Sequence, residues 1–287
     1  DGIRHFCLSR GLGDVYKRQK NILKWGGANQ NAVVLSGDLT TSCEIDEFRS
    51  AYPERFISLG LMEQNMMSFA AGLAREGLLP LVHTFSVFMY RRALDQIEMS
   101  IAYPNLPVKI FGFLPGVTTP GGASHQALND IAVMRSLPNM SIIETGDATD
   151  VENVLEISKN INGPVYIRMI RGEIPRLFPK ENPTVFCESR KLSEGNDIAL
   201  LTSGICTEES LNVTNQLREK GITIQHLHIT TLKPFGDSLI EDALTKVKYG
   251  IITMENHTIV GGLGTCVAEL IAKKGLPKKL IKIKPKL

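Results

Sequence analysis

Short apolar runs alternate with longer amphipathic stretches along the chain from about residue 30 onward. The runs are rich in Val, Ile, Leu and Phe and end at glycine or polar residues, which is typical of strands buried on both faces of a parallel sheet. We predict strands over 32–35, 56–59, 79–85, 108–111, 140–143 and 165–169. Apolar positions at helical spacing predict helices over 63–76, 91–102 and 126–136, and a further helix that is capped by Asp147 and runs to Ile161. The alternation predicts an α/β fold with helices on both faces of the sheet.

The same alternation resumes after a break. Residues 173–190 contain three prolines and no helical period, so we predict a linker there. Beyond it, the pattern predicts strands over 198–202, 222–227 and 251–254, and helices over 208–220, 238–247 and 262–273. The chain is therefore expected to form two doubly wound α/β domains, a larger one over 21–172 and a smaller one over 191–287. Residues 1–20 show no clear period, and our hypothesis is that this tail is read-through or assembly sequence.

Charge and cysteine content narrow the functional class. The 287 residues contain 32 basic and 30 acidic side chains, which argues against a nucleic-acid-binding protein. Residues 273–287 hold seven lysines and no acid, a run that we interpret as solvated surface. Five cysteines without a CxxC motif favour a reducing compartment. Because the sequence also lacks a membrane-length apolar stretch and a signal-peptide pattern, we predict a cytoplasmic protein that binds neither nucleic acid nor membrane.

Ligands of open α/β sheets bind beyond the carboxyl ends of the strands, so the segments that follow strands are the first candidates. Glu63 follows the glycine turn at Gly60 and begins an otherwise apolar helix. The helix dipole favours a carboxylate there, while the neighbouring methionines would desolvate it and raise its pKa. This combination suits a group that shares a proton with a bound heterocycle, although an ordinary first-turn glutamate has the same local sequence.

Two further segments carry candidate chemistry. The aromatic cluster of residues 84–90 follows a strand and fits either core packing or stacking on a flat ligand. The glycine-rich segment 118–126 delivers His125 to a helix start, which makes it an acid–base candidate. His226 and His228 share one strand face, but no third ligand is evident, so we interpret them as structural and predict no metal site.

Several ordered segments together resemble the C-terminal half of transketolase, a thiamine diphosphate enzyme. The resemblance extends from about residue 30 to residue 275 and is carried by GLMEQNMMSFAAGLAREG, TFSVFMYRRALDQI, AYPNLPVKI, GGASHQALNDIAVMRSLPNM, GPVYIRMIR, TLKPF and ENHTIVGGLG. It implies that the first domain binds the pyrimidine of the cofactor and that the second is the transketolase C-terminal domain.

The resemblance implies cofactor contacts for five residues. Glu63 matches the glutamate that hydrogen-bonds the pyrimidine ring and helps to remove the proton at thiazolium C2. Phe88 matches the aromatic residue that stacks on the pyrimidine, with Phe85 beside it. Asp38 and Leu39 match residues near the thiazolium ring.

The resemblance also implies substrate contacts. His125 matches an active-site histidine that handles substrate hydroxyls and protons, and Ser42 and Arg171 match positions that bind the sugar phosphate. The family's usual loop before this histidine contains an early histidine and a Glu-Asp pair. Here Leu114 replaces that histidine and the acidic pair is missing, which predicts a modified or branched ketose phosphate as substrate.

The family holds the diphosphate and magnesium with a separate domain that carries a Gly-Asp-Gly motif, and this motif is absent from the 287 residues. The resemblance therefore implies a split transketolase, with Mg²⁺ held mainly by an N-terminal partner subunit in a two-plus-two assembly. The chain also ends where the family continues with another strand and helix, so we expect a truncated C-terminal domain. The alternatives are a relative of 1-deoxyxylulose-5-phosphate synthase, a 2-oxoacid dehydrogenase β subunit, or a non-catalytic paralogue.

Overall fold

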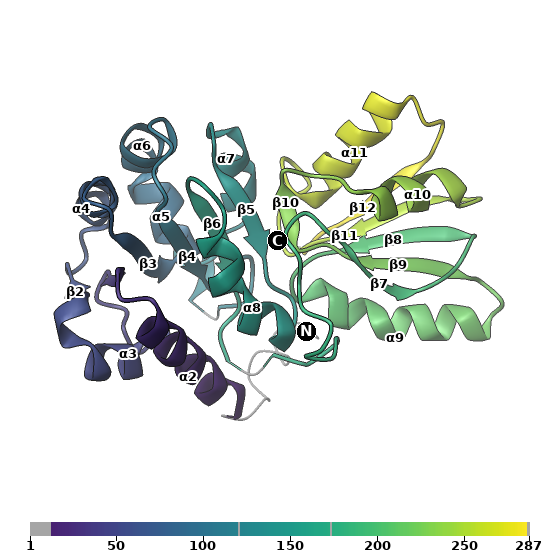
Figure 1. The fold of residues 1–287 in the computed structure, drawn as a ribbon. Helices are drawn as coiled ribbons and strands as arrows, with labels where there is room; N and C mark the ends of the chain where they lie inside the picture. Colours follow the sequence, from purple (N-terminus) through teal and green to yellow (C-terminus); the bar gives the residue numbers. More distant parts are fainter. Residues whose placement is uncertain (1–12, 120, 173, 286–287) are drawn as a thin grey trace.

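In the computed structural model, residues 13–119, 121–172 and 174–285 are described. Two α/β units lie side by side, each built on its own mostly parallel sheet (Figure 1). The predicted fold class is therefore confirmed. The inner strands of both sheets are almost entirely buried, which explains why they appear in the sequence as apolar runs rather than as alternating patterns.

The first sheet has seven strands in the order β10-β5-β6-β4-β3-β1-β2. Six of them are parallel and come from the first part of the chain: β1 (Ala32–Ser36), β2 (Phe56–Ser58), β3 (Leu79–Phe85), β4 (Lys109–Phe113), β5 (Ser141–Glu144) and β6 (Val165–Met169). The predicted strands agree with these bounds to within one or two residues.

Helices connect and cover these strands. They are α2 (Gly13–Ala28), α3 (Asp46–Ala51), η1 (Pro53–Arg55), α4 (Glu63–Arg75), α5 (Ser86–Arg92), α6 (Leu94–Gln96), the π-helix η2 (Ile97–Ala102), η3 (Gly122–Ser124), α7 (Asp130–Ser136) and α8 (Ala148–Lys159). Asp147 caps α8 as predicted, because its Oδ1 accepts the Asp150 N–H at 2.8 Å.

Three sequence predictions are wrong in this unit. The predicted helix 91–102 starts earlier, at Ser86, and is divided into α5, α6 and η2. The helix predicted from residue 126 starts at Asp130, since the glycine-rich segment before it forms η3 and turns. Helix α2 begins at Gly13, inside the predicted tail, and Asn21 in α2 donates to the Glu152 carbonyl of α8 at 3.0 Å. Residues 1–12 of that tail lie outside the described residues.

The second sheet has the order β12-β11-β8-β9-β7. Its elements are β7 (Arg190–Ser193), β8 (Ile198–Thr202), α9 (Cys206–Glu219), β9 (Ile224–His228), α10 (Ser238–Lys246), β11 (Gly250–Met254), α11 (Leu263–Lys274) and β12 (Leu280–Ile283). Strand β7 runs antiparallel to β9, and the other pairs are parallel. The short edge strands β7 and β12 were not predicted, because neither forms a buried apolar run.

One strand crosses between the two units. β10 (Thr231–Lys233) follows β9 of the second sheet but pairs antiparallel with β5, at the edge of the first sheet. Thr231 lies opposite Ile143, and Lys233 lies opposite Ile142. The first sheet is therefore completed by residues from the second half of the chain.

A buried ion-pair network lies where the units meet. Arg168 in β6 is fully buried and donates from Nε to Asp130 Oδ2 at 2.8 Å and from Nη1 to Glu144 Oε1 at 2.5 Å. Its Nη2 donates to the backbone carbonyl of Asn256, in the second unit, at 2.9 Å. The guanidinium therefore connects both parts of the molecule through charge-assisted hydrogen bonds.

The predicted linker is packed against both units. Asp147 Oδ2 accepts the backbone N–H groups of Leu177 and Phe178 at 3.1 and 3.0 Å. Asp150 accepts from Arg190 Nη1 at 3.0 Å, and the Ser189 N–H donates to Asp237 Oδ2, at the start of α10 in the second unit, at 2.5 Å. These buried contacts fix the linker at both of its ends.

Candidate active site

Seven of the eight predicted site residues follow the carboxyl ends of parallel strands in the first sheet, and the eighth, Phe85, is the last residue of β3. Glu63 follows β2, Phe88 follows β3, and His125 follows β4. Because parallel strands direct their carboxyl ends to one edge of the sheet, the fold gathers these segments there. This is the expected position of a ligand crevice.

Glu63 is the first residue of α4, and only 2% of its surface is exposed. Its Oε1 accepts a hydrogen bond from Arg92 Nη1 at 2.8 Å. The Arg92 guanidinium in turn lies 4.0 Å from the centroid of the Phe88 ring. Arg92 thus links the candidate carboxylate to the candidate aromatic residue, and the sequence analysis missed it. Its signal is the i,i+4 spacing from Phe88, which places both side chains on one face of α5.

The aromatic cluster consists of Phe85, Phe88 and the His125 ring. The ring centroids of Phe85 and Phe88 are 5.6 Å apart, and His125 meets Phe88 edge-on at 5.5 Å. Phe88 and His125 are half-buried, so the cluster has an open side. His125 Nδ1 also lies 2.9 Å from Ser124 Oγ. The prediction of an aromatic cluster beside an acid–base candidate therefore has a geometric counterpart here.

The segment that carries His125 is held by a second arginine. Arg91 Nη1 donates to the Ala123 carbonyl at 3.0 Å, and its Nη2 reaches the Gln126 carbonyl at 3.4 Å. Arg91 Nε donates to the Tyr90 hydroxyl at 3.0 Å, and burial raises the pKa of Tyr90. The two adjacent arginines of α5 therefore have different partners: Arg91 holds the segment that carries His125, and Arg92 bonds Glu63.

The loop after β1 carries Asp38, Leu39 and Ser42. Asp38 is exposed and has a left-handed backbone with φ of 64°. Gly37 lies close to the start of α4, since a Cβ added there would be 3.7 Å from the Gly60 carbonyl. The Ser42 loop meets the Arg171 loop through Glu44, whose Oε1 accepts the Gly172 N–H at 3.2 Å.

The remaining predicted residues lie apart from the aromatic cluster. Within the described part of the chain, no hydrogen bond, ion pair or ring contact joins Asp38, Leu39, Ser42 or Arg171 to that cluster. They line the same sheet edge as a separate group, on the loops after β1 and β6.

Sequence comparisons assign both units. Residues 19–176 match the transketolase pyrimidine-binding domain, and residues 188–284 match the transketolase C-terminal domain. The chain belongs to the transketolase family. This confirms the resemblance on which the site assignment rests.

Relatives and solved structures agree with this assignment. A transketolase C-terminal section of Methanocaldococcus jannaschii is 37% identical over 95% of this chain and 87% of its own length. A 6-deoxy-6-sulfo-D-fructose transketolase subunit of Clostridium sp. is 32% identical over 88% of this chain and 78% of its own length. A split-gene transketolase, solved as an inactive β4 tetramer, superposes with a TM-score of 0.87 at 35% identity, over 96% of this chain and 90% of that chain.

The two histidines of β9, His226 and His228, lie away from the sheet edge and have buried polar partners. His226 Nε2 lies 2.9 Å from Thr202 Oγ1, and His228 is paired with Asp150, so both rings take part in buried polar contacts. Burial lowers the pKa of His226 to about 4.

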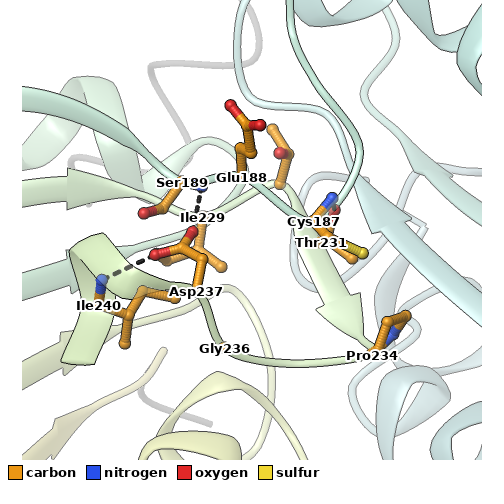
Figure 2. Close-up of a pocket in the computed structure, with 10 residues that line it drawn as sticks. Cys187, Glu188, Ser189, Ile229, Thr231, Pro234, Gly236, Asp237 and Ile240 are labelled. Carbon is orange, nitrogen blue, oxygen red and sulfur yellow. Dashed lines mark hydrogen bonds between the residues drawn. The ribbon is translucent and has the colours of Figure 1, made fainter.

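A small pocket, drawn in Figure 2, lies between the linker and the segment around β10. It is lined by Cys187, Glu188, Ser189, Ile229, Thr230, Thr231, Pro234, Gly236, Asp237 and Ile240.

Among residues 13–119, 121–172 and 174–285, no helix combines the length and the apolar character needed to span a bilayer.

The donor set at the sheet edge fits thiamine diphosphate, the cofactor of this family. A buried carboxylate is suited to accept a hydrogen bond from an aminopyrimidine, and Glu63 is such a group. A half-exposed aromatic ring is suited to stack on a heterocycle, and Phe88 lies beside the Glu63–Arg92 pair. The residues present therefore match the pyrimidine half of this cofactor.

Proposed function

We propose that the chain is one subunit of a split transketolase-type enzyme that transfers a two-carbon ketol unit from a ketose phosphate to an aldose. The observation that carries this proposal is the buried Glu63 next to the half-open cluster of Phe88 and His125, at the carboxyl edge of a parallel sheet. Thiamine diphosphate, when bound, supplies the chemistry for breaking and forming a carbon–carbon bond beside a carbonyl.

The protein groups have distinct proposed roles. Glu63 accepts a hydrogen bond from the pyrimidine and fixes its protonation, and Arg92 balances the charge of this carboxylate. Phe88 would orient the ring by stacking, with Phe85 packed beside it, and His125 would transfer protons at substrate hydroxyls.

The loops after β1 and β6 complete the proposed site. With the cofactor bound, Asp38 and Leu39 would lie near the thiazolium, and Ser42 and Arg171 would bind the substrate phosphate. The hydrogen bond from the Gly172 N–H to Glu44 supports the assignment of Ser42 and Arg171, because it brings their two loops together.

A partner chain is proposed to supply the diphosphate and Mg²⁺ sites, because the Gly-Asp-Gly motif is absent from this sequence. Beside Glu63, the apolar side chains of Leu61 and Met62 are 67% and 56% exposed, a surface that a partner subunit would cover. The similar split-gene transketolase is inactive as a β4 tetramer, which supports the view that this section needs a partner. We propose a two-plus-two assembly in the cytoplasm.

A modified or branched ketose phosphate is the proposed donor. The loop after β4 lacks the acidic pair of the usual family pattern. One relative is named for 6-deoxy-6-sulfo-D-fructose, a modified ketose that carries a sulfonate in place of a phosphate. Another, a transketolase subunit of Actinobacillus succinogenes, is named for apulose 4-phosphate. A faster reaction with xylulose 5-phosphate than with every modified ketose would contradict this assignment.

The second candidate is activity like that of 1-deoxy-D-xylulose-5-phosphate synthase. The enzyme of Natranaerobius thermophilus is 32% identical over 88% of this chain, but the match covers only 40% of its own length. Release of CO₂ from pyruvate by the assembled complex, without ketol transfer, would favour this candidate or a 2-oxoacid dehydrogenase β subunit. We also propose that the larger domain ends at residue 172, that residues 173–190 are the linker and that the smaller domain covers 191–287. The larger domain includes α2, so its start lies before the predicted limit of residue 21.

The test starts from this chain co-expressed with the product of the adjacent reading frame. Bound thiamine diphosphate is quantified in the purified complex and in this chain alone, and we expect cofactor only in the complex. Glu63→Ala is expected to lower turnover at least about 100-fold with the assembly intact. Glu76→Ala, at the exposed end of the same helix, is the control. Unchanged turnover in Glu63→Ala would refute the mechanism, and absence of cofactor from both samples would favour a non-catalytic paralogue.

A further inference from the structure

The segment that leads to His125 is contacted by a side chain from the other unit. Asn256 follows β11 of the second sheet, and only 2% of its surface is exposed. Its Oδ1 accepts the Val117 N–H at 3.0 Å, and its Nδ2 donates to the Pro115 carbonyl at 3.1 Å. One amide group therefore satisfies a donor and an acceptor of the same short loop, which fixes the loop backbone in position and orientation.

The loop is shaped to receive this amide. Gly116, between the two bonded residues, has φ of +63°, and a Cβ at this position would lie 2.1 Å from Asn256 Oδ1. Only glycine fits both the conformation and the close approach. The Gly116 N–H donates to the Ala127 carbonyl at 2.7 Å, so the same turn is tied to a residue two positions after His125.

Asn256 is itself held rigidly. Its backbone carbonyl accepts from Arg168 Nη2, and the preceding residue, Glu255, accepts the N–H groups of Leu263 and Gly264 at 2.6 and 2.8 Å, at the start of α11. A side chain that is fixed by its surroundings can position a neighbour to within a fraction of an ångström. On the opposite side, Arg91 binds the Ala123 and Gln126 carbonyls.

We propose that Asn256 is a positioning residue, through which the C-terminal unit sets the location of His125 at the sheet edge. The role of His125 rests on the proposed function, but the contact from Asn256 to its loop does not. Asn256 bonds the backbone on both sides of Gly116, and Gly116 in turn bonds the Ala127 carbonyl. His125 lies in the chain between Ala127 and Ala123, whose carbonyl is held by Arg91. The second unit would then contribute to catalysis without touching the substrate.

The test compares Asn256→Ala with a matched control, Lys233→Met. Lys233 also bonds two backbone carbonyls of the first unit, those of Arg135 at 2.9 Å and Leu137, but it does not bond the loop that carries His125. Each variant is prepared in the complex with its partner chain. The ring ¹³Cε1–¹H signal of His125, assigned with His125→Gln, and the amide exchange of residues 113–119 are measured, with thermal unfolding recorded in parallel.

In Asn256→Ala we expect a shifted His125 signal and loop exchange faster by at least about fivefold, the factor for the loss of one of the two ordinary hydrogen bonds that the amide makes. Turnover of the best ketose phosphate should fall by about 10- to 100-fold, because small displacements of a reacting group are costly. Thiamine diphosphate retention should stay within about twofold of wild type, since Glu63 and Phe88 are untouched. Asn256→Asp keeps the acceptor for Val117 but loses the donor to Pro115, so it should recover part of the loop protection.

An unchanged His125 signal in Asn256→Ala overturns the proposal, as does an equal change in Lys233→Met. If the wild-type complex transfers no ketol unit but Asn256→Ala still shifts the His125 signal, the proposed function fails while the positioning role stands.

Discussion

Replacing Arg168 with Met should cost the protein a large part of its stability. The guanidinium is fully buried and is bonded to two buried carboxylates, those of Asp130 and Glu144. Methionine fills a similar volume but leaves both carboxylates without their cation, and breaking a buried ion pair in this way costs about 3–5 kcal/mol. With a urea m-value of about 3 kcal/mol/M, the unfolding midpoint should fall by about 1–1.7 M.

The loss should depend on pH. Burial by itself raises the pKa of Asp130, but Arg168 and, secondarily, His257 outweigh it and hold this pKa below its usual value. In the wild type, the stabilisation from this carboxylate is present above its unfolded-state pKa of about 4 and is lost as pH falls through the lower folded value. In Arg168→Met, burial is uncompensated and the pKa of Asp130 rises. The deficit should therefore be largest near pH 7 and shrink towards pH 4.

Urea unfolding followed by far-UV circular dichroism and by the fluorescence of Trp25, the single tryptophan, measures both effects. Lys274→Met is the control, because it breaks the half-exposed pair with Glu241 and should cost no more than about 1 kcal/mol. If the midpoint of Arg168→Met shifts no further than that of Lys274→Met, the reasoning about the buried pair is refuted.

Three further predictions concern single groups. Gly116→Ala should destabilise the chain by at least about 1 kcal/mol, because position 116 has a left-handed φ and a Cβ there would clash with the Asn256 side chain. The cost should be smaller in an Asn256→Ala background, where that clash is removed. Equal costs in the two backgrounds, measured as urea midpoints in a double-mutant cycle, contradict the described contact. Burial raises the pKa of Glu255 to about 7, so the stabilisation from its protonated form is full below the unfolded-state pKa near 4.3 and is lost as pH rises to about 7. The unfolding free energy of the wild type should therefore decline between pH 5 and 7, and Glu255→Gln should make this decline shallower. An unaltered slope in Glu255→Gln counts against the assignment. Burial raises the thiol pKa of Cys206, and that of Cys266 to about 12, so both should resist a disulfide reagent at pH 8 until urea unfolds the chain, as peptide mass spectrometry would show; rapid labelling of the folded protein is the opposite result.

The sequence located the strands well because fully buried strands leave continuous apolar runs, as in β3 and β6. It misplaced the start of α5 for the same reason. Val87 and Met89 are buried and directly extend the apolar run of β3, so strand and helix cannot be told apart there from periodicity. The strands β7, β10 and β12 are only three or four residues long and depend on pairing with distant segments.

In the candidate site, too, residues on locally recognisable segments could be predicted, and long-range contacts could not. Glu63, Phe88 and His125 could be chosen from the rule that ligands bind at carboxyl strand ends, together with the family resemblance. The bond from Arg92 to Glu63 and the bonds from Asn256 to its loop could not be predicted, because these contacts are tertiary; only the spacing of Arg92 from Phe88 is a local signal. Arg92 meets a carboxylate 29 residues away, and Asn256 meets a loop 139 residues away, distances at which local pattern carries no information.

The position of β10 has a consequence for how this architecture can be divided. Cutting the chain in the 173–190 segment would remove β10 and leave β5 as an open edge with unpaired backbone groups, a template for aggregation. During synthesis, the first sheet cannot close until the ribosome has passed Lys233. Exchange of the two halves between homologous genes would therefore succeed only when the incoming half brings a compatible β10. We therefore expect the two units to fold together and to be exchanged together.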